Sequence, residues 1–162
     1  MRTILLTLMV LAAPMMVSAQ ESVPKAWGYA FGGVGGSTGD FGSTALLHFG
    51  GGGEGRIWRG LGAGAEVGYL LPARNASDGV GLLSTNVEYH FVGSGRSQKV
   101  VPFVTGGFSL AFRQGSAGGG NFGGGVNYWM KPRLGLRLEF RDHIFSSDSP
   151  HILGFRVGLS FR

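Results

Sequence analysis

The chain has 162 residues, a formal net charge of +5, 32 glycines and no cysteine. The lack of cysteine excludes a disulfide framework and thiol chemistry, and so much glycine argues against a helical protein. The basic residues are scattered rather than gathered into the stripe that nucleic-acid binding needs, so nucleic acid is not an expected partner. This length supports a single domain.

The first 19 residues have the features of a secretory signal peptide. Arg2 gives a positive start, residues 4–17 are mostly apolar, and Val17-Ser18-Ala19 supplies small residues for cleavage. A membrane anchor is the alternative, but the apolar stretch is short for a helical span. We therefore expect three parts: a signal peptide over 1–19, a short segment over 20–26 and a β-domain over 27–162.

Strand-like alternation recurs along the rest of the chain. Segments of about 10–13 residues at ~3.3 Å each, tilted by ~40°, give about 25–33 Å, which matches a hydrocarbon core of ~30 Å. An even number of strands suits a closed bacterial barrel. The sequence therefore predicts an all-β fold, an eight-stranded antiparallel up-and-down transmembrane β-barrel. The eight segments are about 27–35, 43–53, 60–71, 80–92, 100–113, 121–130, the strand after Pro132, and 151–161.

The strand after Pro132 carries the clearest pattern. Its sequence RLGLRLEFRDHIF alternates between apolar residues and a second set that includes Arg137, Glu139 and Arg141. A period of two predicts a β-strand, because successive side chains point to opposite faces. A soluble sheet alternates in the same way, but here a two-residue turn and a glycine-rich partner precede the strand. Together with the charged set, these favour a narrow barrel with charges inside and leucines toward lipid.

With a periplasmic N-terminus, the connections alternate between turns and outer loops. The predicted periplasmic turns are 54–59, 93–99 and 131–132, and the outer loops are 36–42, 72–79, 114–120 and 146–150. This threading predicts two aromatic girdles, as in outer-membrane barrels. The periplasmic girdle comprises Trp27, Trp58, Trp129, Tyr89, Phe91, Tyr128 and Phe161, and the outer girdle Tyr69, Phe112, Phe122, Phe140 and Phe155.

Three segments resemble a known family. The sequence VVPFVTGGFSLAF is similar to a Pro-aromatic-Val-x-x-Gly strand of small outer-membrane β-barrel domain proteins, the OmpA/OmpX-like class of eight-stranded barrels. GGGVNYW followed by LGLRLEFRDH resembles their paired penultimate strands, and LGFRVGLSFR resembles their closing strand. The resemblance covers most of the chain after the signal peptide and implies the architecture, not an activity.

Six charged residues would point into the lumen. An eight-stranded barrel is nearly filled by its own side chains, so these charges must be paired or hydrated. A structural ion network is the preferred interpretation, and a narrow polar conduit is the alternative. The six are Glu66, Glu88, Arg137, Glu139, Arg141 and Arg156.

The region from 141 to 151 places His, Ser and Asp together near the outer rim. A serine nucleophile with a histidine base is the arrangement that acyl chemistry requires. The segment distantly resembles lipid A deacylases, in which His and Ser lie two residues apart; here Ser146 follows His143 by three. A solvated polar loop is the preferred interpretation. A catalytic set of His143, Ser146 and Asp148 is the alternative.

The sequence predicts no metal site and no cofactor. His48, His90, His143 and His151 lack the spacing of metal ligands. We expect an exported, porin-like protein of the cell outer membrane in a Gram-negative envelope. Its role would be structural or surface interaction, more plausibly non-enzymatic, and its partners would be outer-membrane lipid, lipopolysaccharide and the assembly machinery.

Two alternatives remain at this point. One is a lipid A-modifying hydrolase in the same membrane. The other is a soluble calycin-like barrel that binds a small apolar ligand, which would reverse every strand and turn the leucines inward.

Overall fold

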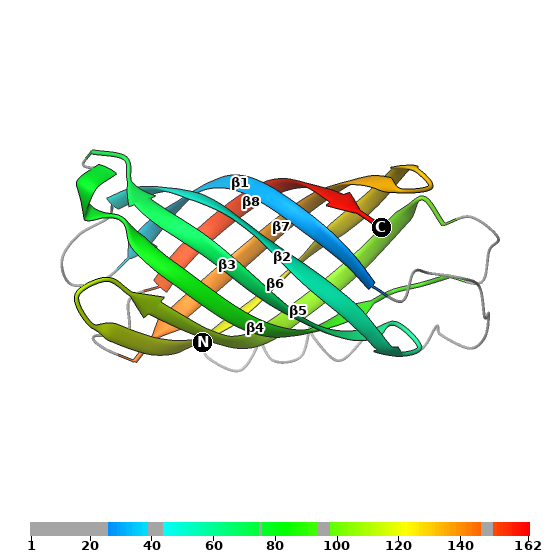
Figure 1. Ribbon diagram of the computed structural model, residues 1–162, viewed down its shortest axis with the longest axis horizontal. Coiled ribbons are helices and arrows are strands. Elements are labelled where there is room, and N and C mark those ends of the chain that lie inside the picture. Colours follow the sequence, from blue (N-terminus) through cyan, green and yellow to red (C-terminus); the bar gives the residue numbers. More distant parts are fainter. Residues whose placement is uncertain (1–25, 39–43, 75, 94–97, 147–150) are drawn as a thin grey trace, which may run out of the picture.

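A computed structural model shows a closed antiparallel barrel of eight strands (Figure 1). The structure describes residues 26–38, 44–74, 76–93, 98–146 and 151–162, so the predicted signal peptide over 1–19 lies outside the described part. Strand order follows the sequence all the way round, and the last strand pairs with the first, with Gly28 opposite Phe161. Each strand therefore has a partner on both sides, which removes the free edges of the sheet.

The predicted all-β barrel is confirmed, and three of its strands, β1, β2 and β6, are longer than expected. The extensions cover 36–38 at the end of β1, 54–58 at the end of β2 and 116–120 at the start of β6, and each contains or adjoins a run of glycines, which gives a weak strand signal. A short 3-10 helix, η1, spans Ala76–Asp78. The strands are β1 Ala26–Thr38, β2 Thr44–Trp58, β3 Leu61–Pro72, β4 Val80–His90, β5 Val100–Phe112, β6 Ser116–Lys131, β7 Leu134–Phe145 and β8 His151–Phe161.

Among the residues that the structure describes, no helix is long and apolar enough to cross a membrane.

We call the end where β1 begins and β8 ends the terminal end, and the opposite end the loop end (Figure 1). At the terminal end, β2 turns into β3 through Arg59 and Gly60, whose φ angles are 32° and 92°. Glycine adopts such a φ without the steric cost of a Cβ. The predicted turn over 54–59 is therefore too long, and Glu54 lies inside β2 with its side chain buried.

The two faces of the barrel wall differ sharply in chemistry. Val104, Phe108 and Val157 lie on the outer face and are about half exposed, at 49%, 55% and 44%. Charged side chains from the same sheet are buried in the lumen. Apolar residues therefore face outward and charges inward, and the calycin-like alternative, which requires the reverse, is wrong.

The predicted aromatic girdles are correct in part. Every member of the outer girdle is exposed on the outer face, and so is Trp58 at the terminal end. Trp27 and Trp129, however, are only 5% and 8% exposed and lie inside the barrel. Their alternation places them on the inner face with Tyr29 and Asn127, so they close the lumen instead of anchoring the barrel in the lipid interface.

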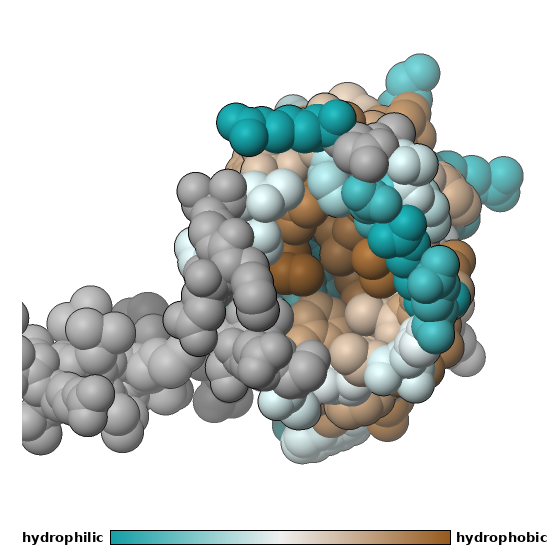
Figure 2. Space-filling model, turned by 90° about the vertical axis from the view of Figure 1, so that its left-hand side faces the viewer, coloured by the Kyte–Doolittle hydropathy of each residue, from teal (hydrophilic) through white to brown (hydrophobic). Residues whose placement is uncertain are grey.

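Apolar clusters lie toward both ends of the lumen, on either side of its polar middle. The terminal cluster contains Trp27, Val101 and Trp129, and extends inward through Tyr29 and Phe31. The loop cluster is a second buried group on strands β2, β3, β4 and β7. Figure 2, which looks at the loop end, shows apolar surface within a hydrophilic rim. The loop cluster comprises Leu46, Leu70, Leu82 and Phe145.

Candidate functional site

The middle of the lumen holds a network of charges centred on Glu139. Arg137, Glu139 and Arg141 are successive inward residues of β7. Glu139 accepts hydrogen bonds from Arg137 Nε at 2.9 Å, from Arg141 Nε at 2.7 Å, and from Arg156 Nη2 of β8 at 2.7 Å. One carboxylate thus holds three guanidinium groups, which satisfies charges that would be costly to bury alone.

The same arginines reach carboxylates across the lumen. Arg156 Nη1 donates to Glu66 Oε1 of β3 at 2.6 Å, and Arg137 Nη2 lies 3.0 Å from both oxygens of Glu88 on β4. Tyr29 also donates to Glu66 Oε2, at 3.1 Å. Because β7 and β8 lie across the barrel from β3 and β4, these contacts join opposite walls.

Aromatic faces enclose two of the arginines. The Arg137 guanidinium carbon lies 4.6 Å from the ring centre of Tyr29 and 4.0 Å from that of Phe103. The Arg156 carbon lies 4.2 Å from the Phe31 ring centre. Such cation–π contacts strengthen when water is excluded, so the aromatic residues hold the guanidinium planes in place.

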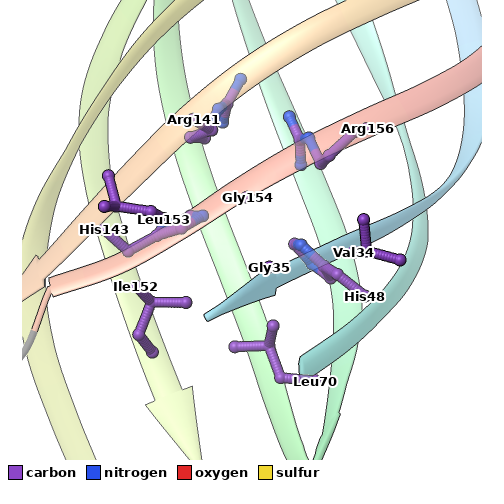
Figure 3. A pocket seen from close by; sticks show the side chains of 10 residues that line it. All are labelled: Val34, Gly35, His48, Leu70, Arg141, His143, Ile152, Leu153, Gly154 and Arg156. Atoms are coloured by element: carbon purple, nitrogen blue, oxygen red, sulfur yellow. The ribbon is translucent and has the colours of Figure 1, made fainter. Parts of the chain in front are cut away.

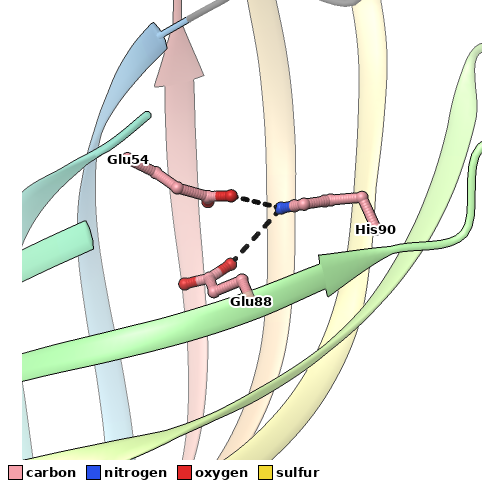
Figure 4. Close-up of side chains that lie close together, drawn as sticks. All are labelled: Glu54, Glu88 and His90. Atoms are coloured by element: carbon pink, nitrogen blue, oxygen red, sulfur yellow. Dashed lines mark hydrogen bonds and ion pairs between the residues drawn. The ribbon is translucent and has the colours of Figure 1, made fainter. Parts of the chain in front are cut away.

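On the terminal side of the network, Glu54, Glu88 and His90 converge (Figure 4). His90 Nε2 lies 2.5 Å from Glu54 Oε1 and 3.6 Å from Glu88 Oε2. Arg137 Nη1 lies 3.8 Å from Glu54 Oε2. All three converging side chains are buried, and we call them the terminal triad.

On the loop side of the network, the polar groups are hydroxyls, amides and imidazoles. Ser109 Oγ lies 2.8 Å from Ser84 Oγ and 3.0 Å from His143 Nδ1, and it accepts a hydrogen bond from Asn121 Nδ2 at 2.9 Å. Within the described part of the chain, Nε2 of His143 and Nε2 of His48 have no hydrogen-bond partner.

A small cavity adjoins these two histidines (Figure 3). Its volume is about 10 Å³, and Arg141, Arg156 and Leu70 also line it. This is close to the smallest space that holds one water molecule. A water there could satisfy imidazole nitrogens, but the space is too small for an organic substrate.

The two described residues of the predicted catalytic alternative, His143 and Ser146, lie in different surroundings. His143 is buried in the lumen against Ser109, whereas Ser146 lies exposed at the rim and donates its Oγ proton to the Gly118 carbonyl at 3.0 Å. Asp148 lies outside the described residues. Nearby, Asp142 Oδ2 lies 2.8 Å from His151 Nδ1.

The six charges predicted for the lumen all lie there, each 1–2% exposed, and they pair within one network. Sequence reasoning missed Glu54, because the surrounding GGGGEG offers no apolar alternation to reveal its face. It also treated His90 and His143 as scattered polar residues. The alternation from Glu88 already places His90 on the inner face, and the same count from Arg141 places His143 there too.

Solved structures with a similar fold include three outer-membrane barrels. Neisserial surface protein A is 15% identical, with a TM-score of 0.72 over 87% of this chain and 99% of its own. The N-terminal barrel domain of Pseudomonas aeruginosa OprF is 16% identical, with a TM-score of 0.59 over 84% and 96%. Ail, the attachment invasion locus protein of Yersinia pestis, is 9% identical, with a TM-score of 0.52 over 84% and 95%. At these identities the likeness shows the fold.

The sequence itself matches a family model over nearly its full length. No curated protein matches this sequence. The model for the outer membrane protein beta-barrel domain matches residues 3–161, and a closed eight-stranded barrel with an apolar outer face agrees with that match. The chain therefore belongs to the outer membrane protein beta-barrel domain family.

Proposed function

We propose that this outer-membrane barrel is a non-enzymatic protein with a structural or surface-interaction role and a lumen closed to solutes. One observation carries the proposal, namely the ion network that joins opposite walls through Glu139 and its three arginines. A hydrated ion could pass only by separating these buried pairs. An eight-stranded barrel leaves little further room.

The apolar clusters toward both ends of the lumen support the same proposal. Trp27 and Trp129 lie at the terminal end, and Leu70 and Phe145 at the loop end. A charged solute would have to enter these clusters before it reached the polar middle, and apolar constrictions oppose the passage of ions.

For the surface-interaction role, we place the loop end outside the cell. There Arg113 Nη2 donates to the Ser77 carbonyl at 3.0 Å and to Asp78 Oδ1 at 2.9 Å, which ties β5 to the short helix η1. These contacts link two neighbouring connections, and an ordered loop binds a partner at a lower entropic cost. The names of Neisserial surface protein A and of the attachment invasion locus protein agree with such a role.

The proposal includes three partners. Outer-membrane lipid contacts the apolar outer face, lipopolysaccharide surrounds the loop end, and the assembly machinery inserts the barrel. Export through the signal peptide over 1–19 belongs to the same proposal.

Two measurements test it. The purified barrel in planar lipid bilayers should give no conductance steps. Lipid A from cells with the wild-type protein, with His143→Gln and without the protein should carry the same acyl chains. Steady ion conductance by the wild type would contradict the closed lumen. Loss of an acyl chain that depends on His143 would favour the hydrolase.

A further inference from the structure

We propose that the terminal triad of Glu54, Glu88 and His90 binds one divalent transition-metal ion of the Zn²⁺ type. Each residue offers one ligand atom, and the three atoms lie within 4.8 Å of one another. Glu88 and His90 are successive inward residues of β4, and Glu54 is an inward residue of β2 on the far side of β3, so the barrel wall itself fixes their separation. The structural role proposed above does not require this site.

The separation of His90 from Glu88 suits two ligands of one metal ion, whereas His90 and Glu54 are already joined by a hydrogen bond. His90 Nε2 and Glu88 Oε2 are 3.6 Å apart, which is too long for a hydrogen bond. Two ligands at ~2.0–2.1 Å from a tetrahedral zinc lie roughly 3.3 Å apart. The 2.5 Å contact between His90 Nε2 and Glu54 Oε1 would have to open by about 0.8 Å as the metal replaced the proton between them.

The charge of the lumen provides a second, independent reason. Four buried glutamates, Glu54, Glu66, Glu88 and Glu139, face three buried arginines, Arg137, Arg141 and Arg156. The fully buried part of the network thus has one more carboxylate than guanidinium, and Arg56, the next inward residue of β2 after Glu54, is partly exposed.

The extra carboxylate is most evident at Glu54, which is 3% exposed. Its Oε2 atom has no hydrogen-bond partner among the described residues, and its ion-pair contact with Arg137 Nη1 is long, at 3.8 Å. A buried carboxylate without a full partner attracts a cation.

Neighbouring groups hold the triad in position. Arg137 Nη2 binds both oxygens of Glu88 at 3.0 Å, as hydrogen bonds from outer residues orient ligating carboxylates. The ring of His90 meets Trp27 edge-on, with ring centres 5.1 Å apart, and lies 5.5 Å from the Phe103 ring centre. These contacts fix the imidazole so that Nε2 points at both carboxylates (Figure 4).

The donor set selects the class of metal. One imidazole and two carboxylates suit Zn²⁺ and similar transition metals, whereas Ca²⁺ and Mg²⁺ prefer oxygen ligands alone and in greater number. The site also lies close to the terminal end. His90 is the last residue of β4, and the next inward residue after Glu54 is the partly exposed Arg56. The route from solvent is therefore short.

Binding of Zn²⁺ and Co²⁺ to the folded barrel in detergent tests the proposal. Metal content, calorimetry and the visible spectrum of the Co²⁺ form should give one ion per barrel with a tetrahedral or five-coordinate spectrum. Saturating Zn²⁺ should also raise the temperature at which the folded band is lost on a denaturing gel. His90→Gln and Glu54→Gln should each weaken Zn²⁺ binding at least tenfold.

His48→Gln is the matched control, because it changes a buried lumen histidine outside the triad and should leave Zn²⁺ affinity unchanged. The heat-dependent gel shift of each variant shows whether it has folded, and Glu88→Gln provides a second ligand variant if one fails. Absence of binding by the folded wild type at 1 mM Zn²⁺, on the order of the weakest useful affinity, would overturn the proposal, since the triad would then share only a proton. Equal binding by folded wild type and His90→Gln would also overturn it, because the metal would lie elsewhere, for example at the half-exposed His151.

Discussion

The middle of the lumen and its loop side are both polar, but they are built in opposite ways. In the middle, Glu139 and its arginines are joined by hydrogen bonds of 2.7–2.9 Å. On the loop side, Ser109 links uncharged groups, and Nε2 of His48 and of His143 find no hydrogen-bond partner among the described residues, beside a cavity of about 10 Å³. Single guanidinium nitrogens such as Arg156 Nε also lack a hydrogen-bond partner among the described residues, but each buried arginine has a carboxylate partner. Buried charges require such an ionic partner, whereas a neutral group tolerates a missing partner that one water can replace. We therefore expect substitutions in the middle to cost more.

Glu139→Gln should have the largest effect. It keeps the shape of the side chain but removes the charge that three buried arginines share. Breaking a buried ion pair costs about 3–5 kcal/mol, and we expect the free energy of unfolding to fall by this amount. Urea unfolding in lipid vesicles, followed by tryptophan fluorescence, measures it.

The matched control is Asp78→Asn, which removes a charge from the exposed pair with Arg113 at the rim. Exposed pairs contribute about 0–1 kcal/mol. If both variants lost the same stability, the network would not be a special feature of the lumen.

An added methyl group at Gly52 should have the next largest effect. A Cβ there would lie 2.6 Å from the Ala65 carbonyl oxygen and 2.8 Å from the Tyr29 hydroxyl, in the crowded middle of the lumen. Overpacking costs about 1–3 kcal/mol, so Gly52→Ala should lower the free energy of unfolding by this amount in the same vesicle assay.

Gly53→Ala gives the control one residue away on the outer face. Its Cβ would come no closer than 3.7 Å, to the Trp27 carbonyl oxygen. We expect a change within about 0.5 kcal/mol, as at surface positions without special contacts. A larger loss for Gly53→Ala than for Gly52→Ala would contradict the assignment of inner and outer faces.

Ser109→Ala should have the smallest effect of the three lumen changes. The substitution leaves Ser84, Asn121 and His143 each without one hydrogen bond. Because the adjacent cavity can hold a water, we expect a cost of about 1 kcal/mol, the low end for orphaned groups. Ser146→Ala at the rim should change stability by less than about 0.5 kcal/mol. A loss for Ser109→Ala as large as that for Glu139→Gln would remove the distinction between the two regions.

The barrel and the direction of its faces could be predicted from the sequence, because both depend on a local period of two. The alternation after Pro132 placed Arg137, Glu139 and Arg141 on one face, and the structure has all three in the lumen. The same reasoning failed where a segment lacked alternation, and where residue type was given more weight than alternation. Glu54 sits in a run of glycines, and Trp27 was assigned to the lipid interface by residue type rather than by its alternation with Tyr29.

The sequence by itself determined that alternating strands of membrane-spanning length would close into a barrel with charges inside, because side-chain direction in a strand is set by the backbone alone. Only the tertiary structure decided which charges meet. Arg156 and Glu66 are 90 residues apart and come together through the closure of the sheet, as do Arg137 and Glu88, which are 49 residues apart. The convergence of Glu54, Glu88 and His90 depends on the register of β2, β3 and β4. Register is a property of strand pairs, and a single strand does not contain it.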